Sequence, residues 1–245
     1  MTLSFDPPVI AHRGASADAP ENTMAAFTRA IQLGIEWVEF DVMLAACGTP
    51  IVFHDETLER TTNTTGFVKD HSYAYLRTLD AGSWFHASFA GERIPSLAQV
   101  AEFLADTGLH ANVEIKPLPG QGEQTVIETL KVLSPFFDAS SPSILFSSFS
   151  VPVLEFLRAR APRCHMGLLM HDWLPTWQAS VDSLQCVSIH AENDMLTEER
   201  VKHLKCSGKE LLSYTVNDID RAEALFSWGV DAVFSDCPDQ IARFS

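Results

Sequence analysis

Short apolar runs rich in β-branched residues alternate with amphipathic segments along almost the whole chain. Apolar runs of this kind, bounded by turn residues, are typical of buried strands, and the amphipathic segments between them are typical of helices. Eight strands are predicted, at 9–12, 36–42, 111–115, 143–147, 165–169, 186–189, 210–215 and 230–234. A further run at 50–53 is predicted as the returning arm of a hairpin that turns at 46–49, where Gly48 supplies the turn.

Helix-end signals agree with this division. The first helix is predicted to begin at an Asn22 cap and to end at Gly34 in a left-handed conformation. Ser96 and Gln99 form a capping-box pattern for a helix that Gly108 closes. The other predicted helices begin near Gln121, Ser150, Thr197 and Asp218, stop before Pro135, before Pro162, at Gly208 and at Gly229, and include one within 172–184.

Strands that are almost wholly apolar and are each followed by a helix indicate a parallel sheet covered by helices. Eight such units favour a closed (β/α)8 TIM barrel over an open doubly wound sheet. The sequence contains neither a G-x-G-x-x-G fingerprint nor a P-loop. We therefore predict one α/β barrel domain over 1–245. The stretch 56–93 fits no strand-helix unit and is predicted to be an insertion after the hairpin, a candidate lid or specificity element.

The charge balance narrows the choice of partners. The chain has 17 basic and 32 acidic residues and a net charge of −15, which argues against nucleic acid or an anionic membrane as the main partner. A phosphate ligand would need locally placed positive charge. The N-terminal residues lack the pattern of a signal peptide and no apolar run is long enough to span a membrane, so a cytoplasmic location without a stable membrane anchor is expected.

Polar residues gather at the predicted carboxyl ends of strands, where barrel enzymes carry their active sites. Glu39 and Asp41 share one face of a strand, and Glu114 ends the third strand. Three carboxylates that converge would repel one another unless a cation lies between them. Oxygen ligands suit Mg²⁺ or Ca²⁺ better than zinc. The alternative interpretation of Glu39 and Asp41 is a solvated strand end.

His12 and His54 also lie at strand ends beside carboxylates, because the hairpin brings His54 back to the level of Asp41. Imidazole titrates near neutral pH, so these two histidines are candidate proton carriers, whereas most of the other seven are expected to be structural. Arg13 and Lys116 are candidates for the positive charge at a phosphate. Their alternative roles are a surface ion pair for Arg13 and a plain ion pair of Lys116 with Glu114. The residues alone predict metal-assisted hydrolysis of a phosphate ester.

An ordered set of motifs then gives a resemblance that covers nearly the whole chain. The motifs are His12-Arg13-Gly14, Pro20-Glu21-Asn22-Thr23, Glu39-Phe40-Asp41-Val42, Phe53-His54-Asp55, Gly91-Glu92-Arg93-Ile94-Pro95-Ser96-Leu97, Val113-Glu114-Ile115-Lys116, Ser148-Phe149 and Tyr214-Thr215-Val216-Asn217. Each motif alone is weak, but in this order they resemble the glycerophosphodiester phosphodiesterase family, in its cytoplasmic bacterial branch. The hairpin turn departs from the family's frequent Asp-Gly pair, with Cys47 before Gly48.

The resemblance implies a TIM barrel that hydrolyses glycerophosphodiesters to sn-glycerol 3-phosphate and an alcohol. It implies one divalent cation, Mg²⁺ or Ca²⁺, on Glu39, Asp41 and Glu114, with acid-base catalysis by His12 and His54. Substrate contacts are implied for Arg13 and Lys116, and more weakly for Asn217. A monomer or homodimer is expected. Two alternatives stay open: a catalytically silent barrel that binds glycerol phosphates, and a lysophospholipase D-like member of the same superfamily.

Overall fold

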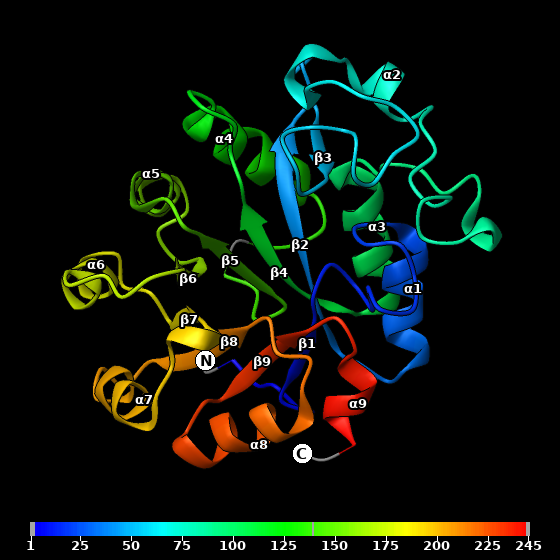
Figure 1. Cartoon of the computed structure of the whole chain (residues 1–245). Helices are drawn as coiled ribbons and strands as arrows, with labels where there is room; N and C mark the ends of the chain where they lie inside the picture. Colours follow the sequence, from blue (N-terminus) through cyan, green and yellow to red (C-terminus); the bar gives the residue numbers. More distant parts are fainter. Residues whose placement is uncertain (1–2, 139, 244–245) are drawn as a thin grey trace.

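A closed ring of parallel strands forms the centre of the computed structural model, which describes residues 3–138 and 140–243. β1 (Val9–Ala11) pairs with β2 (Trp37–Leu44) on one side and with β9 (Ala232–Ser235) on the other, which closes the ring (Figure 1). Between β2 and β9 follow β4 (His110–Ile115), β5 (Ile144–Ser148), β6 (His165–Met170), β7 (Ser188–Glu192) and β8 (Glu210–Tyr214). All pairings within the ring are parallel, so the predicted (β/α)8 barrel is confirmed.

Helices surround the barrel and cover the outward faces of its strands (Figure 1). In chain order these are α1 (Met24–Gln32), α3 (Leu97–Thr107), α4 (Gly122–Leu133), α5 (Val151–Arg160), α6 (Trp177–Ser183), α7 (Glu198–Lys205), α8 (Ile219–Trp228) and α9 (Pro238–Ala242). The outward residues Val38, Phe40 and Val42 of β2 belong to the large apolar core between strands and helices. In the described ranges, no helix is both long and apolar enough to cross a bilayer.

The inward faces of the strands change from apolar to polar along the barrel axis. On β2 the alternation of a strand directs Trp37, Glu39 and Asp41 to the same side. Trp37 packs in an apolar cluster with Ile10, Leu145, Leu212 and Phe234, which fills one end of the interior. Glu39 and Asp41 come later on β2 and therefore lie closer to the carboxyl end of the barrel than this apolar cluster.

Helix ends follow the sequence signals closely, with two corrections. The capping box of Ser96 and Gln99 and the left-handed Gly108 are both present at α3. The cap of α1, however, is Thr23, whose hydroxyl accepts a hydrogen bond from the Ala26 amide. Asn22 was predicted there, but its own backbone is left-handed (φ +57°) and cannot serve as the cap. In the segment 172–184 the helix begins only at Trp177, because Pro175 and its neighbours precede α6.

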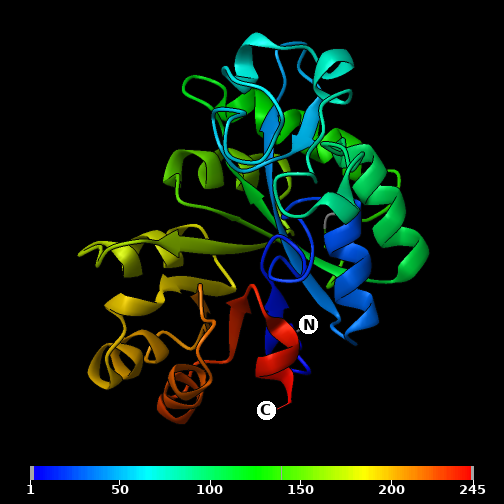
Figure 2. The ribbon, with the colours of Figure 1, turned by 45° about the vertical axis from the view of Figure 1, so that its right-hand side comes forward.

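The segment 56–93 leaves the hairpin arm β3 (Pro50–Val52), which pairs antiparallel with β2. Figures 1 and 2 show it beyond β3 and next to α3, on the outside of the ring of helices. It contains α2 (Tyr73–Leu76) and short 3-10 turns, and its Leu58, Val68 and Leu76 share a small apolar core with Met43 and Ile51 of the hairpin. The carboxylate of Asp80 accepts hydrogen bonds from the backbone amides of residues 82, 83 and 91, which holds the loop together.

Candidate active site

Three carboxylates meet at the carboxyl end of β2 and β4. The parallel register pairs Asp41 with Glu114 and Glu39 with Asn112, so the three acidic side chains face inward on neighbouring positions. Glu39, Asp41 and Glu114 each offer an oxygen, and these oxygens lie within 4.8 Å of one another. All three are buried, with exposed fractions of 4%, 1% and 9%. The predicted convergence of the three carboxylates is therefore present.

Burial and mutual repulsion make this cluster unfavourable when it is fully ionised. Burial, followed by the charge of Asp41, raises the pKa of Glu114 to about 8. Burial, Asp41 and Glu114 raise the pKa of Glu39 well above its usual range. For Asp41 burial acts in the same direction, but Arg13 and Lys116 outweigh it and lower its pKa. Two of the three carboxylates thus lack enough positive charge around them, which is the electrostatic signature of a cation site.

Two basic side chains stand beside the carboxylates. Arg13 Nε is 3.5 Å from Asp41 Oδ2, and Lys116 Nζ is 3.5 Å from Asp41 Oδ1. The backbone amide of Arg13 donates to Glu39 at 3.0 Å, which is possible because residue 13 adopts a left-handed backbone (φ +56°). Gly14 follows at φ +80°, where a Cβ atom would lie 2.7 Å from Ala26. The His12-Arg13-Gly14 turn therefore needs its glycine to pack against α1.

His12 is held by a carboxylate behind it. Its Nδ1 makes a 2.7 Å hydrogen bond with Asp236 Oδ1, which leaves Nε2 on the side of Glu39, 3.9 Å from Glu39 Oε2. Burial raises the pKa of Asp236, but the bonds from His12, Asn217 and Ser16 outweigh it and lower the pKa to about 2. Asn217 donates to Asp236 Oδ2 at 2.7 Å and accepts from the Asp236 amide at 2.8 Å. Asn217 thus lies behind the histidine, and its contact with substrate stays a prediction.

His54 is held in the same way from the hairpin side. Its Nδ1 lies 2.5 Å from Asp55 Oδ1, and burial lowers the pKa of the imidazole. Arg60 of the insertion then joins two carboxylates: its Nε and Nη2 donate to Asp55, and its Nη1 and Nη2 donate to Glu21. Glu21 in turn accepts from Arg13 Nη1 at 2.7 Å. One exposed arginine therefore fixes the partners of both His54 and Arg13.

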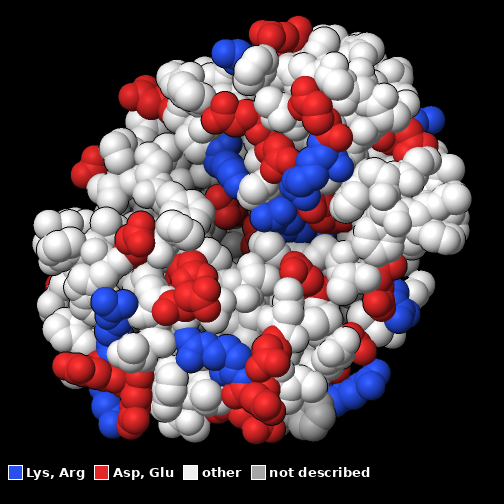
Figure 3. Space-filling model, viewed as in Figure 1, with Lys and Arg blue, Asp and Glu red and all other residues white. Residues whose placement is uncertain are grey.

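These groups surround a cavity of about 190 Å³. It is lined by six of the residues that the sequence singled out: His12, Arg13, Glu39, His54, Glu114 and Lys116. In the face shown in Figure 3, basic and acidic side chains gather around a hollow near the centre. This is the local positive charge that an acidic protein needs in order to hold a phosphate. None of the described residues that line the cavity belongs to 56–93.

The sequence analysis missed four residues that position this site. Asn22 donates to Asp41 Oδ2 at 2.9 Å from a buried position, whereas it was assigned to a helix end. Asp55 and Asp236 orient the two histidines, and Arg60 connects Asp55 to Glu21. The adjacency of Asp55 to His54 was a usable signal. Asp236 and Arg60 reach the site only through the closure of the barrel and the path of the insertion.

The donor set fits a hard divalent cation. All three converging ligands are carboxylate oxygens, and thiolates are absent from the described cluster, as expected for Mg²⁺ or Ca²⁺ rather than zinc. Besides Arg13 and Lys116, Asn22 contacts Asp41 through a hydrogen bond of the kind that orients metal ligands. Two imidazoles, two cationic side chains and a cation site around one cavity provide what phosphoryl transfer requires.

Comparison with known proteins agrees with the chemistry that this site supports. The model of the glycerophosphoryl diester phosphodiesterase family matches residues 12–240. The chain is similar to a glycerophosphodiester phosphodiesterase of Caldanaerobacter subterraneus, with 37% identity over 95% of both chains. It is 32% identical to one of Bacillus subtilis, over 94% of this chain and 83% of the relative.

A solved structure is similar over almost the entire length. It is an Oleispira antarctica phosphodiesterase in complex with the product sn-glycerol-3-phosphate, with a TM-score of 0.93 and 38% identity over 98% of this chain and 97% of that one. The match of the family model and these relatives agree with the carboxylates, histidines and cations described above. The chain belongs to the glycerophosphoryl diester phosphodiesterase family.

Proposed function

We propose that this protein hydrolyses glycerophosphodiesters to sn-glycerol 3-phosphate and an alcohol, with a divalent cation on Glu39, Asp41 and Glu114. One observation carries the proposal. Two histidines, each hydrogen-bonded to an aspartate, lie around the same cavity as the cluster of buried carboxylates. The product held by the similar Oleispira antarctica phosphodiesterase supports the substrate class. A complete set of histidines and carboxylates favours this enzyme over a catalytically silent barrel.

Charge neutralisation is the first task of the site. A divalent cation held by the three carboxylates would supply positive charge near the phosphate oxygens. Arg13 and Lys116 line the same cavity, and they share the charge that grows on the phosphate as the reaction proceeds. Arg13 is held by Glu21 and Asp41, so its guanidinium is fixed before substrate arrives. This pre-organisation is the source of the electrostatic contribution.

Proton transfer is the second task. One histidine takes the proton of the attacking oxygen, which forms a new bond to phosphorus. The bond from phosphorus to the alcohol oxygen breaks, and the other histidine gives that oxygen a proton. In both His12 and His54 the Nδ1 atom is hydrogen-bonded to an aspartate, so Nε2 is the atom that exchanges the proton. With water as the attacking oxygen this single displacement gives sn-glycerol 3-phosphate. With the glycerol 2-hydroxyl as the attacking oxygen it gives a cyclic phosphate, and water must then attack phosphorus and break the bond to the 2-oxygen in a second displacement.

Substitution of each histidine tests the scheme. His12→Ala and His54→Ala are each expected to lower kcat for glycerophosphocholine by about 100-fold or more, since acid-base catalysis contributes about 10²–10⁴-fold. His86→Ala, at an exposed insertion residue bonded to Ser88, is the matched control and is expected to retain activity. Near-normal turnover in either site variant would remove that histidine from the scheme.

A substrate with a better leaving group assigns the two roles. A nitrophenyl ester of glycerol 3-phosphate needs little protonation of its departing oxygen. The variant that lacks the general acid is therefore expected to lose far less activity on this ester than on glycerophosphocholine. The variant that lacks the general base is expected to lose activity equally on both substrates. A coupled assay for glycerol 3-phosphate measures the natural diester, and nitrophenol absorbance measures the other.

Removal of the metal tests the cation site. EDTA is expected to abolish turnover, and separate addition of Mg²⁺ and of Ca²⁺ identifies the ion that restores it. Full activity after exhaustive chelation would contradict a role for the cation, and inactivity with every diester and ion would contradict the enzyme. The cytoplasmic location and the choice between monomer and homodimer stay predictions from the sequence.

A further inference from the structure

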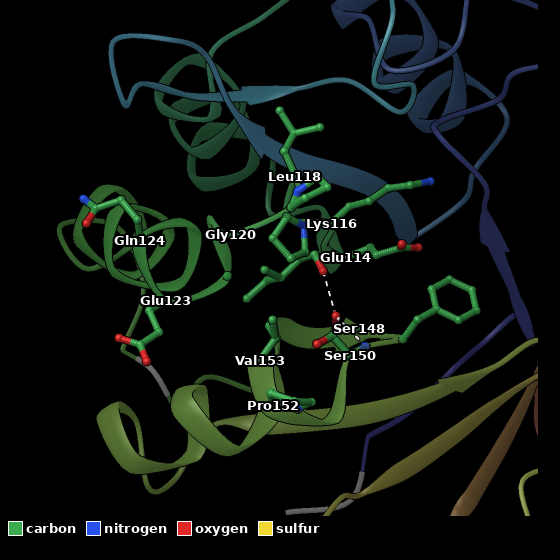
Figure 4. A pocket seen from close by; sticks show the side chains of 15 residues that line it. Glu114, Lys116, Leu118, Gly120, Glu123, Gln124, Ser148, Ser150, Pro152 and Val153 are labelled. Atoms are coloured by element: carbon green, nitrogen blue, oxygen red, sulfur yellow. Dashed lines mark hydrogen bonds between the residues drawn. The ribbon is translucent and has the colours of Figure 1, made fainter. Parts of the chain in front are cut away.

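Two side chains on the carboxyl face of the barrel join the end of one strand to the end of a neighbouring strand. Ser148 at the end of β5 donates its hydroxyl to the Ile115 carbonyl at the end of β4, at 2.8 Å (Figure 4). Asn193, directly after β7, donates from Nδ2 to the Thr215 carbonyl, directly after β8, at 3.1 Å. Thr215 lines the active-site cavity, so the bond from Asn193 holds one wall of the cavity in place.

An arginine in the first turn of α8 holds Asn193 in turn. Arg221 donates from Nε to Asn193 Oδ1 at 3.2 Å and from Nη2 to the Asn193 carbonyl. Its Nη2 also donates to the Leu196 carbonyl at 3.0 Å, and its guanidinium lies 5.2 Å from the centre of the Trp228 ring. The planar guanidinium thus contacts both the side chain and the backbone of Asn193, which fixes the direction of the amide toward Thr215.

The loop after β8 connects this bond to the partner of His12. One residue separates Thr215 from Asn217, and Asn217 makes two hydrogen bonds with Asp236. Its Nδ2 donates to Asp236 Oδ2 at 2.7 Å, and its Oδ1 accepts from the Asp236 amide at 2.8 Å. Asp236 Oδ1 lies 2.7 Å from His12 Nδ1. A displacement of the Thr215 carbonyl therefore reaches the imidazole through two short hydrogen-bonded contacts.

A second arginine binds the same region without contacting this loop. Arg200 of α7 donates to the Met195 carbonyl at 2.6 Å, and its guanidinium lies 5.3 Å from the centre of the Trp173 ring. It therefore anchors the short 3-10 helix that begins at Asn193 in the same manner as the arginine of α8 does. In the described part of the chain it makes no hydrogen bond to Asn193 or Thr215. Arg200 thus separates general stabilisation of this region from an effect on the loop after β8.

We propose that Arg221 and Asn193 are positioning residues for His12. They act through the loop after β8 and through Asp236, and neither is among the described residues that line the cavity. The inference rests on the proposed role of His12 in hydrolysis and adds to it the residues that hold the histidine in place. Without the bond from Asn193, the loop shifts and Asp236 orients the imidazole less firmly. The Nε2 atom then lies less often where it exchanges a proton with the substrate.

Asn193→Asp tests the inference at a single bond. The new carboxylate still accepts from Arg221, but it has no hydrogen to donate to the Thr215 carbonyl. We expect kcat for glycerophosphocholine to fall about tenfold, with KM nearly unchanged, because the loss concerns orientation during the reaction. Arg221→Met is expected to give a similar loss, and Arg200→Met is expected to keep the wild-type kcat. In His12→Ala protein, the further change Asn193→Asp is expected to lower kcat no more, since residues that act as a unit are not additive.

A measurement on the imidazole keeps this inference separate from the proposed hydrolysis. The proton on His12 Nδ1 gives an imidazole N–H signal in NMR spectra, which is identified by its absence in His12→Ala. Its exchange with water is expected to be about tenfold faster in Asn193→Asp and in Arg221→Met, because local opening becomes easier, and unchanged in Arg200→Met. If the wild type cleaves no diester, the proposed hydrolysis fails, while the exchange rates still decide the positioning.

Three outcomes overturn the proposal. The first is unchanged proton exchange in both Asn193→Asp and Arg221→Met. The second is equally faster exchange in Arg200→Met, which would assign the effect to the stability of the region. The third is a loss of kcat from Asn193→Asp that is equally large with and without His12.

Discussion

Asn22 shows how one buried polar residue serves the site instead of the helix next to it. Its left-handed backbone ends the turn before α1, and its side-chain amide donates to Asp41 Oδ2 at 2.9 Å. Thr23 takes over the capping of α1. Asn and Gly tolerate this backbone region better than other residues do. Asparagine therefore meets both requirements of position 22, a left-handed backbone and a side-chain hydrogen-bond donor.

Asn22→Gly separates these two roles. Glycine keeps the left-handed backbone without strain, but the donor to Asp41 is lost. The affinity of the carboxylates for a divalent cation is expected to fall about 10- to 100-fold, as is typical for partners of metal ligands. Metal dependence of activity and calorimetric titration with Mg²⁺ or Ca²⁺ measure this loss.

Asn22→Ala serves as the comparison. It removes the same donor and adds the cost of a left-handed non-glycine residue, about 1–2 kcal/mol, so its thermal stability is expected to fall below that of Asn22→Gly. Metal affinity is expected to be similar in the two variants. Wild-type metal affinity in Asn22→Gly would show that Asp41 needs no donor from this side.

The sequence predicted the residues that line the cavity better than the residues that hold them. Glu39 and Glu114, which line the cavity, and Asp41, which is buried beside them, follow from strand alternation and from the rule that barrel sites lie at strand ends. The pairing of His12 with Asp236 depends on the last strand closing against the first, which no local pattern encodes. Arg60 belongs to an irregular segment, whose path follows from the small core that it shares with the β2–β3 hairpin rather than from a repeating period.

At the scale of elements, the insertion and the β2–β3 hairpin form one unit with the active site. The prediction that 56–93 contacts the substrate as a lid gains no support from the cavity, which this segment does not line. It reaches the site through Arg60, which makes four hydrogen bonds to Asp55 and Glu21. Strands and most helix ends were predictable because each has a local signal, whereas the insertion has none of comparable strength.

Arg60→Met is expected to lower kcat/KM by about tenfold, within the range for residues that orient functional side chains. Methionine keeps much of the apolar stem but removes the planar fork that joins Asp55 to Glu21. Asp55 then holds His54 less rigidly, and Glu21 holds Arg13 less rigidly. Steady-state kinetics on glycerophosphocholine measure the effect, and Arg60→Lys is expected to recover only part of the loss.

Arg77→Met is the matched control for this prediction. Arg77 is exposed at the end of α2 in the same insertion, and no ion pair within 4 Å is found for it in the described residues. Its replacement is expected to leave kinetics unchanged. Equal losses of kcat/KM in Arg60→Met and Arg77→Met would assign the effect to the insertion in general. An unchanged kcat/KM in Arg60→Met would show that His54 and Arg13 keep their positions without Arg60.

At the scale of the whole molecule, an acidic chain buries three of its carboxylates together at the carboxyl end of the barrel. With a net charge of −15, the protein gains nothing in solubility from burying them. Their placement costs stability in the absence of a cation, because burial and repulsion oppose ionisation of Glu39 and Glu114. The carboxylates that the proposed reaction needs therefore lower the stability of the metal-free protein, and a bound cation is expected to restore that stability.

This competition predicts a stability that depends on pH and metal together. The pKa of Glu114 is raised from 4.5 to about 8, so its contribution to stability is fully present below about pH 4.5 and is lost as pH rises through about 8. Glu39 acts in the same direction. Asp55 and Asp236 have pKa values lowered to about 2, so their contributions disappear only in acid and do not overlap with this window. The increase in Tm caused by saturating Mg²⁺ or Ca²⁺ is expected to be larger at pH 8 than at pH 6.

Glu114→Gln isolates the carboxylate responsible, because it keeps the shape of the side chain and removes its charge. At pH 8 the metal-free variant is expected to be more stable than the metal-free wild type by about 1 kcal/mol or more, or about 2–4 °C in Tm for each kcal/mol in a chain of this size. The metal-induced shift and the hydrolytic activity are expected to be strongly reduced in the same variant. Thermal unfolding at pH 6 and pH 8, with EDTA and with each ion, measures the stability and the metal-induced shift, and the coupled assay for glycerol 3-phosphate measures the activity. Lower stability of metal-free Glu114→Gln at pH 8 would show that the ionised carboxylate is already compensated by Arg13 and Lys116 without a cation.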